Sequence, residues 1–292
     1  MAQDGGAVAE RGTPVDGAGA GERDGREVAP PGVDITVAHS ARVYDWWLGG
    51  TDNFAVDRAV GTAFAEAIPD IRTMARENRR FLDRVVDHLV REAGVQQFLD
   101  IGSGIPTSPN LHEVARRTTP DARVVYVDND PIVLAHSRAL IADSGAGATE
   151  YIHADLRDPA SILADPVLAR TLDLGQPVAL MLVAMLMLIT DEDDPWGTSR
   201  ELMDALPPGS YVVITHPGQD FDPAAMAKVV EAAGRGGLTL VPRDRAEVER
   251  FFGDWELVEP GLVPVLAWRP DGPQPADPNA AYYWAGVARK PG

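Results

Sequence analysis

Residues 98–106 read Phe-Leu-Asp-Ile-Gly-Ser-Gly-Ile-Pro, and this stretch decides the fold. Its first four residues are apolar except for Asp100, as is typical of a strand that a sheet buries on both faces. Gly102 and Gly104 follow directly, and glycine lets a backbone turn tightly and approach a ligand because it has no Cβ. The sequence therefore predicts a buried strand that ends in an acidic, glycine-containing loop.

A second predicted strand, Arg-Val-Val-Tyr-Val at residues 123–127, runs directly into Asp128. A nucleoside site requires this pair of features. The glycine loop offers backbone amides to one part of the ligand, and a carboxylate one βαβ unit later accepts hydrogen bonds from the ribose hydroxyls. Gly-x-Gly alone occurs in many loops, whereas the order strand, glycine turn, helix, strand and acid is much more specific.

Strand and helix patterns alternate along the chain from Val95 onward. We expect strands near residues 97–101, 123–127, 149–153, 177–184 and 210–215, with helices at about 109–118, 131–142, 159–172 and 195–205. A helix near 244–252 precedes two closing strands, near 255–259 and 282–289, which we expect at the edge of the sheet. This alternation predicts a Rossmann-like α/β fold, with about seven mostly parallel strands and helices on both faces.

The chain before this region has two parts. Residues 1–38 contain no aromatic side chain and are rich in Gly, Ala, Asp and Glu, so we expect a disordered acidic leader. Residues 39–94 contain an aromatic segment around Tyr44, followed by two stretches of helical pattern, and predict an N-terminal helical lid. Residues 95–292 form the predicted core.

Composition excludes several classes of function. The formal net charge of −18 argues against a nucleic-acid-binding surface, which needs a basic footprint. The longest apolar run, residues 177–189, is too short to span a membrane, and the N-terminus has no signal-peptide pattern. With no cysteine there is neither a disulfide framework nor a thiolate metal site. We therefore expect a cytoplasmic protein with no nucleic-acid or membrane partner. The sequence indicates no metal-binding residues, and it specifies neither a metal requirement nor the oligomeric state.

Three motifs together resemble those of a known enzyme class. Residues 98–106, Val-Val-Tyr-Val-Asp-Asn-Asp-Pro at 124–131 and His-Ala-Asp-Leu-Arg-Asp-Pro at 153–159 resemble the successive ligand-binding motifs of class I S-adenosylmethionine-dependent methyltransferases. More narrowly, residues 41–45, 48–54 and 78–82 resemble a bacterial family of such enzymes whose substrates are largely uncharacterised. The resemblance extends from about residue 34 to residue 290. It implies that the cofactor is S-adenosyl-L-methionine.

The resemblance also implies roles for single residues. Those that match the first motif and line the methionine moiety of the cofactor are Asp100, Gly102, Ser103 and Gly104. Asp128 matches the ribose-binding acid, and Asn129 is expected beside the adenine. Asp155 matches the acceptor for the adenine amino group, with the Leu156 amide nearby. Carboxylates suit both roles because they accept several hydrogen bonds. Asp128 and Asp155 also have an alternative role as helix N-caps.

Other residues are candidates for the cofactor's remaining contacts. Tyr44, together with Trp46 and Trp47, is expected to pack over the cofactor as part of the lid, although core packing is the alternative for the tryptophans. Asn53 is expected to reach the amino-acid end of the cofactor, with a turn as its alternative role. Arg79 or Arg80 is a candidate partner for the cofactor's carboxylate.

His216 is the candidate catalytic base, since it follows the strand at 210–215 and lies at the expected ligand-binding edge. The residues after the strand at 177–184 are Met-Leu-Met-Leu-Ile-Thr at 185–190, so an acceptor would meet an apolar wall there.

The leading interpretation is methyl transfer to a small-molecule substrate. A nicotinamide-dependent oxidoreductase is an alternative, but the chain has no Tyr-x-x-x-Lys. The apolar wall also leaves open a non-catalytic sensor or scaffold that binds the same cofactor.

Overall fold

The structure is a computed structural model, and it describes residues 21–23, 26–28, 33–142, 147–273 and 275–292. Most of the predicted leader therefore lies outside the described residues. Its described part includes a short hairpin of β1 (Gly21–Arg23) and β2 (Arg26–Val28). None of the described helices is long and apolar enough to cross a membrane.

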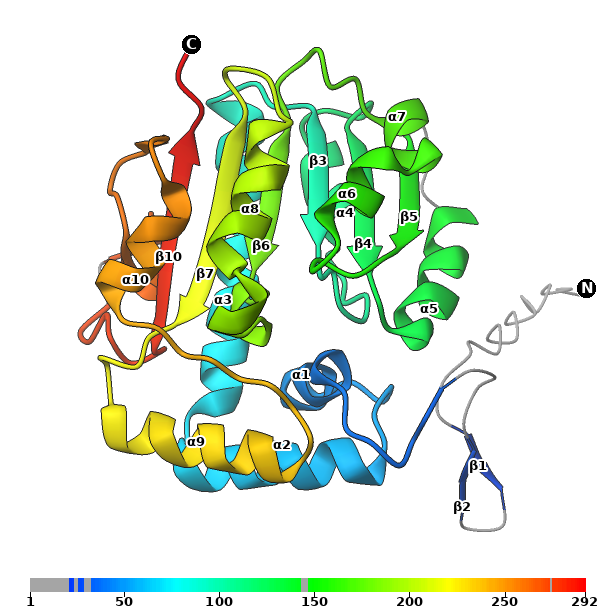
Figure 1. The fold of residues 1–292 in the computed structure, drawn as a ribbon, viewed down its shortest axis with the longest axis vertical. Coiled ribbons are helices and arrows are strands. Elements are labelled where there is room, and N and C mark those ends of the chain that lie inside the picture. Colours follow the sequence, from blue (N-terminus) through cyan, green and yellow to red (C-terminus); the bar gives the residue numbers. More distant parts are fainter. Residues whose placement is uncertain (1–20, 24–25, 29–32, 143–146, 274) are drawn as a thin grey trace, which may run out of the picture.

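The core of the protein is a mixed sheet of eight strands with the order β5-β4-β3-β6-β7-β10-β8, in which β9 also pairs with β10 (Figure 1). The strands are β3 (Gln97–Ile101), β4 (Arg123–Asp128), β5 (Thr149–His153), β6 (Ala179–Val183), β7 (Tyr211–Pro217), β8 (Glu256–Leu257), β9 (Val263–Pro264) and β10 (Tyr283–Arg289). Strands β3 to β7 are mutually parallel, and β10 is antiparallel to β7, β8 and β9. The predicted Rossmann-like fold is confirmed.

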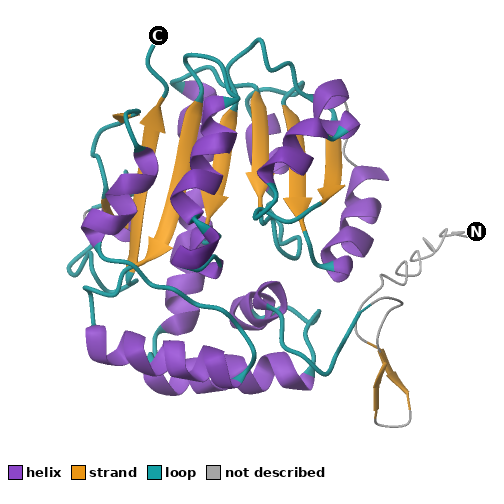
Figure 2. Ribbon diagram, viewed as in Figure 1, coloured by secondary structure: helices purple, strands orange, loops and turns teal. Residues whose placement is uncertain are grey.

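Helices cover both faces of this sheet (Figure 2). The helices of the parallel region are α4 (Leu111–Arg116), α5 (Pro131–Ala142), α6 (Pro159–Ala164), α7 (Pro166–Thr171) and α8 (Pro195–Asp204). Side chains of β3 alternate between two core clusters. Phe98 belongs to the cluster that includes residues of α4 and α5, whereas Leu99 and Ile101 belong to the one that includes residues of α6, α7 and α8. The strand is fully buried because both of its faces are covered, as its apolar run predicted.

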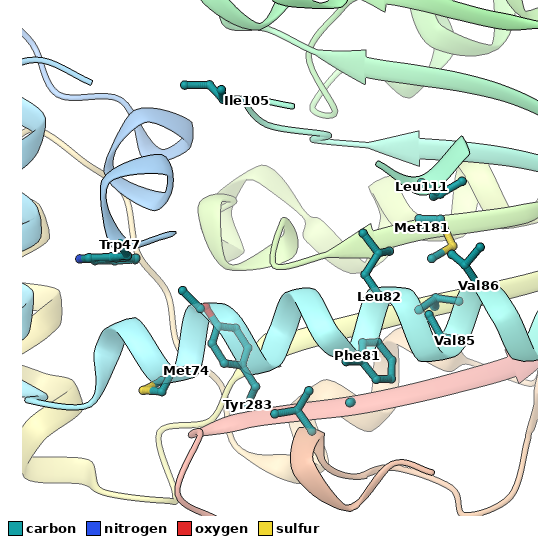
Figure 3. Packing of buried hydrophobic residues seen from close by; sticks show 14 of the residues in the cluster. Trp47, Met74, Phe81, Leu82, Val85, Val86, Ile105, Leu111, Met181 and Tyr283 are labelled. Carbon is teal, nitrogen blue, oxygen red and sulfur yellow. The ribbon is translucent and has the colours of Figure 1, made fainter. Parts of the chain in front are cut away.

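Three helices precede the sheet: α1 (Ser40–Leu48), α2 (Ala55–Ala67) and α3 (Ile71–Arg91). Helix α3 joins the core, and Figure 3 shows Phe81, Leu82 and Val85 of this helix near Met181 of β6 and Tyr283 of β10. Helices α1 and α2 lie beyond the carboxyl ends of the parallel strands, next to α9 (Pro223–Arg235) (Figure 1). The N-terminal segment therefore faces the edge of the sheet where ligands bind in open α/β folds.

Some sequence predictions differ from the structure. Strand β10 lies between β7 and β8 inside the sheet, not at its edge, because the chain returns after β8 to pair with β7. The helix expected over 159–172 is two helices, since Pro166 has no N–H to continue α6 and Asp165 caps α7 instead. Helix α9, the short α10 (Arg245–Glu249) and the 3₁₀ turns η1 (Leu186–Leu188), η2 (Asp191–Asp193), η3 (Arg250–Phe252) and η4 (Val265–Ala267) complete the fold.

The last residues of the predicted leader, 33–38, contact helix α1 through Arg42. The Arg42 guanidinium donates to the backbone oxygens of Asp34 (3.1 Å) and Val37 (3.0 Å). Ala38 is buried as a result.

Candidate functional site

A cavity of about 350 Å³ opens at the carboxyl ends of the parallel strands. Its walls come from α1, α3, the loops after β3, β4, β5 and β6, and residues 237–239 after α9. Nine of the ten predicted cofactor-binding residues line it: Tyr44, Asp100, Gly102, Ser103, Gly104, Asp128, Asn129, Asp155 and Leu156. The volume lies within the range of small-molecule sites.

The loop of Gly102 to Gly104 forms one wall of the cavity, and its backbone conformation requires glycine at two positions. Gly102 has a φ of +73° and Gly104 a φ of +66°, which is the left-handed region that side chains disfavour. A Cβ on Gly102 would collide with the Met185 side chain. The loop is fixed by a hydrogen bond of 2.7 Å from the Gly102 amide to the Val127 oxygen, which joins the ends of β3 and β4.

Asp128 is held in a fixed orientation by two backbone donors. Its Oδ2 accepts from the Gly104 amide (2.8 Å) and its Oδ1 from the Asp130 amide (3.0 Å). Burial raises the pKa of the Asp128 carboxyl, while these two hydrogen bonds oppose the rise. Each carboxylate oxygen keeps a further lone pair for a hydroxyl donor.

The alternative role of the two acids as helix caps does not match the geometry. Helix α5 receives its side-chain cap from Asp130, whose Oδ1 accepts from the Ile132 amide (2.9 Å). Helix α6 is capped by Asp158, which accepts from the Ser161 amide. Asp128 and Asp155 each precede the capping residue and line the cavity instead.

Asp155, which follows β5, contacts the polar side chains of Arg157 and Asn129. The Arg157 guanidinium pairs with its carboxylate and lowers the pKa of Asp155 to about 2. Asn129 donates from Nδ2 to Asp155 Oδ2 (3.2 Å). A carboxylate that stays ionised and oriented in this way suits acceptance from an exocyclic amine.

Asp100 and Arg79 lie at the glycine-loop end of the cavity. Burial raises the pKa of Asp100 to about 7, with the nearby Arg79 opposing the rise and Asp128 adding to it. Arg79 of α3 donates to the backbone oxygens of Thr107 and Pro109, each at 2.9 Å, and lines the cavity. Arg80, the other candidate, is exposed and pairs with Glu77. The structure thus brings Arg79, and not Arg80, to the cavity.

The lid aromatics divide between the cavity and the core. Tyr44 lines the cavity, and its hydroxyl donates to the Ala75 oxygen (2.9 Å). Trp47 is buried in the core and donates to the Gly61 oxygen (3.2 Å). Trp46 packs under the Arg72 guanidinium, 4.3 Å from its ring centre. Neither tryptophan lines the cavity, so core packing describes both.

Asn53 does not line the cavity and instead closes the turn after α1. Its Nδ2 donates to Asp45 Oδ2 (2.8 Å) and to the Gly50 oxygen (3.0 Å), and the side chain is buried. Asp45 itself lines the cavity. The position of Asn53 therefore matches the turn role, and its effect on the cavity passes through Asp45.

His216 also lies outside the cavity lining. Its Nε2 accepts from the Arg243 guanidinium (3.1 Å), which leaves Nδ1 as the donor to the Pro217 oxygen (3.1 Å). The ring is fully buried, and burial lowers the pKa of His216 to about 3. Because its lone pair already accepts a hydrogen bond and the ring does not reach the cavity, the structure gives no support to His216 as a base.

Sequence reasoning missed the lining residues 237–239 and the importance of Arg243. The former follow α9, a helix that the sequence analysis did not predict. Arg243 was one arginine among many in the sequence, and its burial depends on Trp196 and Phe251, whose ring centres lie 5.0 and 5.4 Å from the guanidinium. No local pattern marks such a contact.

Comparison with known proteins identifies the family of the chain. A family profile described as S-adenosyl methyltransferase matches residues 26–291. The chain belongs to the S-adenosyl methyltransferase family. The methyltransferase is similar to a crystal structure of a DUF574 family protein from Streptomyces avermitilis, with 45% identity, a TM-score of 0.85, and coverage of 88% of this chain and 99% of that one. No curated protein matches the chain.

A second crystal structure, of a proposed methyltransferase from Thermobifida fusca, shares 44% identity and a TM-score of 0.83, over 90% of this chain and 98% of that one. The predicted family, enzyme class and cofactor are thereby confirmed: this methyltransferase uses S-adenosyl-L-methionine. The cavity fits that cofactor in volume, in its glycine loop and in the fixed carboxylate of Asp128.

Proposed function

We propose that this methyltransferase transfers the methyl group to a small-molecule acceptor bound beside an apolar wall of the cavity. The observation that carries the proposal is the composition of this wall, which consists of Val183, Ala184, Met185, Met187, Leu188, Ile189, Gly237, Leu238 and Thr239. An acceptor with an apolar body would bury its surface against these side chains.

Different residues along the cavity would bind different parts of the cofactor. Asp128 would hold the ribose hydroxyls, and Asp155 with Asn129 the adenine edge. The loop of Gly102 to Gly104 and Arg79 would hold the methionine end. When bound, the cofactor supplies an activated methyl group on a sulfonium. The chain then has to align acceptor and donor and to exclude water.

The acceptor wall carries no titratable side chain among residues 183–189 and 237–239. An acceptor bound there must therefore present an atom that attacks without a base from this wall. Amines and thiols meet this condition because a fraction of each is unprotonated or ionised near neutral pH. We propose acceptors of these classes, since an alcohol would need a base from another wall of the cavity, where His39 and Asp45 lie.

We also propose that residues 39–94 act as a lid over residues 95–292. Helix α1 is tied to the core at its first turn, where His39 Nδ1 lies 3.0 Å and Arg42 Nε 3.6 Å from Asp130 Oδ2. These contacts hold Tyr44 and Leu48 at the cavity. The net charge of −18 supports a function without nucleic acid, and the absence of cysteine supports a cytoplasmic location.

An acceptor screen tests the proposal. The protein would be incubated with S-adenosylmethionine labelled in its methyl group and with a panel of small amines, thiols, phenols and alcohols, and in parallel with protein and with nucleic acid. We expect label transfer to an apolar amine or thiol, and its loss in Asp128→Ala. Cofactor binding together with transfer only to protein or nucleic acid would contradict a small-molecule acceptor.

A further inference from the structure

One buried polar atom at the cavity has no partner in the described part of the chain. Asn78 of α3 is 2% exposed and lines the cavity, and its Oδ1 makes no hydrogen bond there. An unpaired buried acceptor is destabilising, and such atoms in folded proteins are few. A ligand in the cavity that supplied a donor would remove this cost.

The orientation of the Asn78 amide is fixed by Tyr44. The Tyr44 hydroxyl donates its hydrogen to the Ala75 oxygen (2.9 Å), so it can only accept from Asn78. The Asn78 Nδ2 group lies 3.1 Å from this hydroxyl and is therefore the donor. Exchange of the amide nitrogen and oxygen would place two acceptors against each other, so the remaining atom, Oδ1, is an acceptor.

The neighbours of Asn78 indicate which donor it meets. Arg79 also lines the cavity and forms no ion pair among the residues that the structure describes. Asp100, a carboxylate, is buried at the same end, and a small cavity of about 20 Å³ lies between Arg79, Asp100 and Ser103. One cationic donor beside two acceptors is complementary to a zwitterion, whose carboxylate pairs with the guanidinium and whose ammonium donates to the acceptors.

We propose that Asn78 Oδ1 accepts a hydrogen bond from the α-ammonium group of the methyl donor's methionine moiety, and that Tyr44 holds the amide in this orientation. The inference rests on the proposed placement of the methionine end beside Gly102 and Arg79. It makes Asn78 a binding residue and Tyr44, which comes from the lid helix α1, a positioning residue. Closure of the lid and recognition of the amino-acid end of the ligand are thereby coupled.

Two ligands distinguish recognition of the amino-acid end from recognition of the nucleoside. S-Adenosylhomocysteine carries the α-ammonium and carboxylate, whereas 5′-methylthioadenosine lacks both but keeps the nucleoside. Both would be titrated by calorimetry into the full chain and its variants. We expect Asn78→Leu, which is close in shape, to weaken S-adenosylhomocysteine binding about tenfold or more and to change 5′-methylthioadenosine binding less than about twofold.

Matched variants complete the test. Asn78→Asp keeps an acceptor oxygen and should retain S-adenosylhomocysteine binding, whereas Tyr44→Phe should show a smaller selective loss than Asn78→Leu. Arg79→Met should also lose only S-adenosylhomocysteine, and Arg80→Met should change neither ligand because Arg80 lies outside the cavity.

The outcomes distinguish the inference from the proposed function. Equal losses for both ligands in Asn78→Leu, or no loss for S-adenosylhomocysteine, would overturn the role of Asn78 while leaving the proposed function intact. Binding of neither ligand to the wild-type protein would overturn the proposed function and the inference together. If Asn78→Leu does not fold, as judged by its circular dichroism, Tyr44→Phe decides: an unchanged ratio of the two affinities would refute the coupling.

Discussion

Replacing Arg243 by methionine tests whether a buried guanidinium holds the acceptor wall together. Arg243 is 1% exposed. It donates to the backbone oxygens of Leu186 (3.0 Å) and Ile189 (3.1 Å), both in the segment that follows β6. It also donates to Asp191 Oδ1 (2.6 Å) and to His216 Nε2 (3.1 Å). The side chain therefore joins the apolar wall, β7 and the segment before α10.

The magnitude follows from what the substitution leaves behind. Methionine fills much of the arginine stem's volume, so the loss of packing is small. The Ile189 oxygen and His216 Nε2 remain buried without a donor, however, and each unsatisfied acceptor costs about 1–3 kcal/mol. The Leu186 oxygen keeps a hydrogen bond from the Ile189 amide (3.4 Å), so its share is smaller. Asp191 is largely exposed and regains water, so its share is small. Because some water can reach the wall, we expect Arg243→Met to lower the free energy of unfolding by about 3–5 kcal/mol.

Equilibrium unfolding in guanidinium chloride measures this loss as a lower midpoint at constant slope. Arg200→Met is the control, since Arg200 pairs on the surface with the exposed Asp254 and should lose less than about 1 kcal/mol. A loss below about 1 kcal/mol for Arg243→Met would refute the reasoning, because it would mean that the buried acceptors find other partners.

Two further substitutions probe the glycine-loop end of the cavity. Gly102→Ala should lower the melting temperature and abolish S-adenosylhomocysteine binding, because the position has a φ of +73° and a Cβ would meet Met185; a melting temperature and an affinity like the wild type's would contradict this. Burial raises the pKa of Asp100 from its ordinary 3.8 to about 7 in the folded protein. Between these pH values the folded state binds a proton that the unfolded state does not, so this group makes the free energy of unfolding fall as pH rises. Asp100→Asn should flatten that decline in unfolding free energies measured at several pH values from about pH 4 to 7.5, and an unchanged slope would count against the shift.

The parts of the site that the sequence predicted are those encoded locally. The strand, the glycine turn and the acids at the ends of β4 and β5 follow one another in a fixed order, and parallel strands place their carboxyl ends at one edge. Asp100, Asp128 and Asp155 therefore reach the same cavity although they are far apart in the chain. The choice between Arg79 and Arg80 needed the structure, because both lie on one helix and only its packing decides which faces inward.

The parts that the sequence did not predict depend on distant contacts. Asn53 binds Asp45 and the Gly50 oxygen in the turn after α1, and His216 binds Arg243, which lies on a different segment of the chain. The insertion of β10 between β7 and β8 is likewise a matter of pairing between remote strands. Asn78 begins the motif at 78–82, but the sequence does not indicate its role, because that role follows from an unpaired oxygen whose assignment depends on the contact with Tyr44.

The most direct test of the central claim is a calorimetric titration of S-adenosylhomocysteine into the wild-type protein, Asp128→Ala and the exposed control Asp121→Ala. We predict micromolar binding to the wild type and the control, and binding weakened about tenfold to a hundredfold in Asp128→Ala, as expected for loss of a charged hydrogen-bond acceptor. Equal affinities for all three proteins would contradict the assignment of the cavity, and binding of NADH in place of S-adenosylhomocysteine would contradict the assignment of the cofactor.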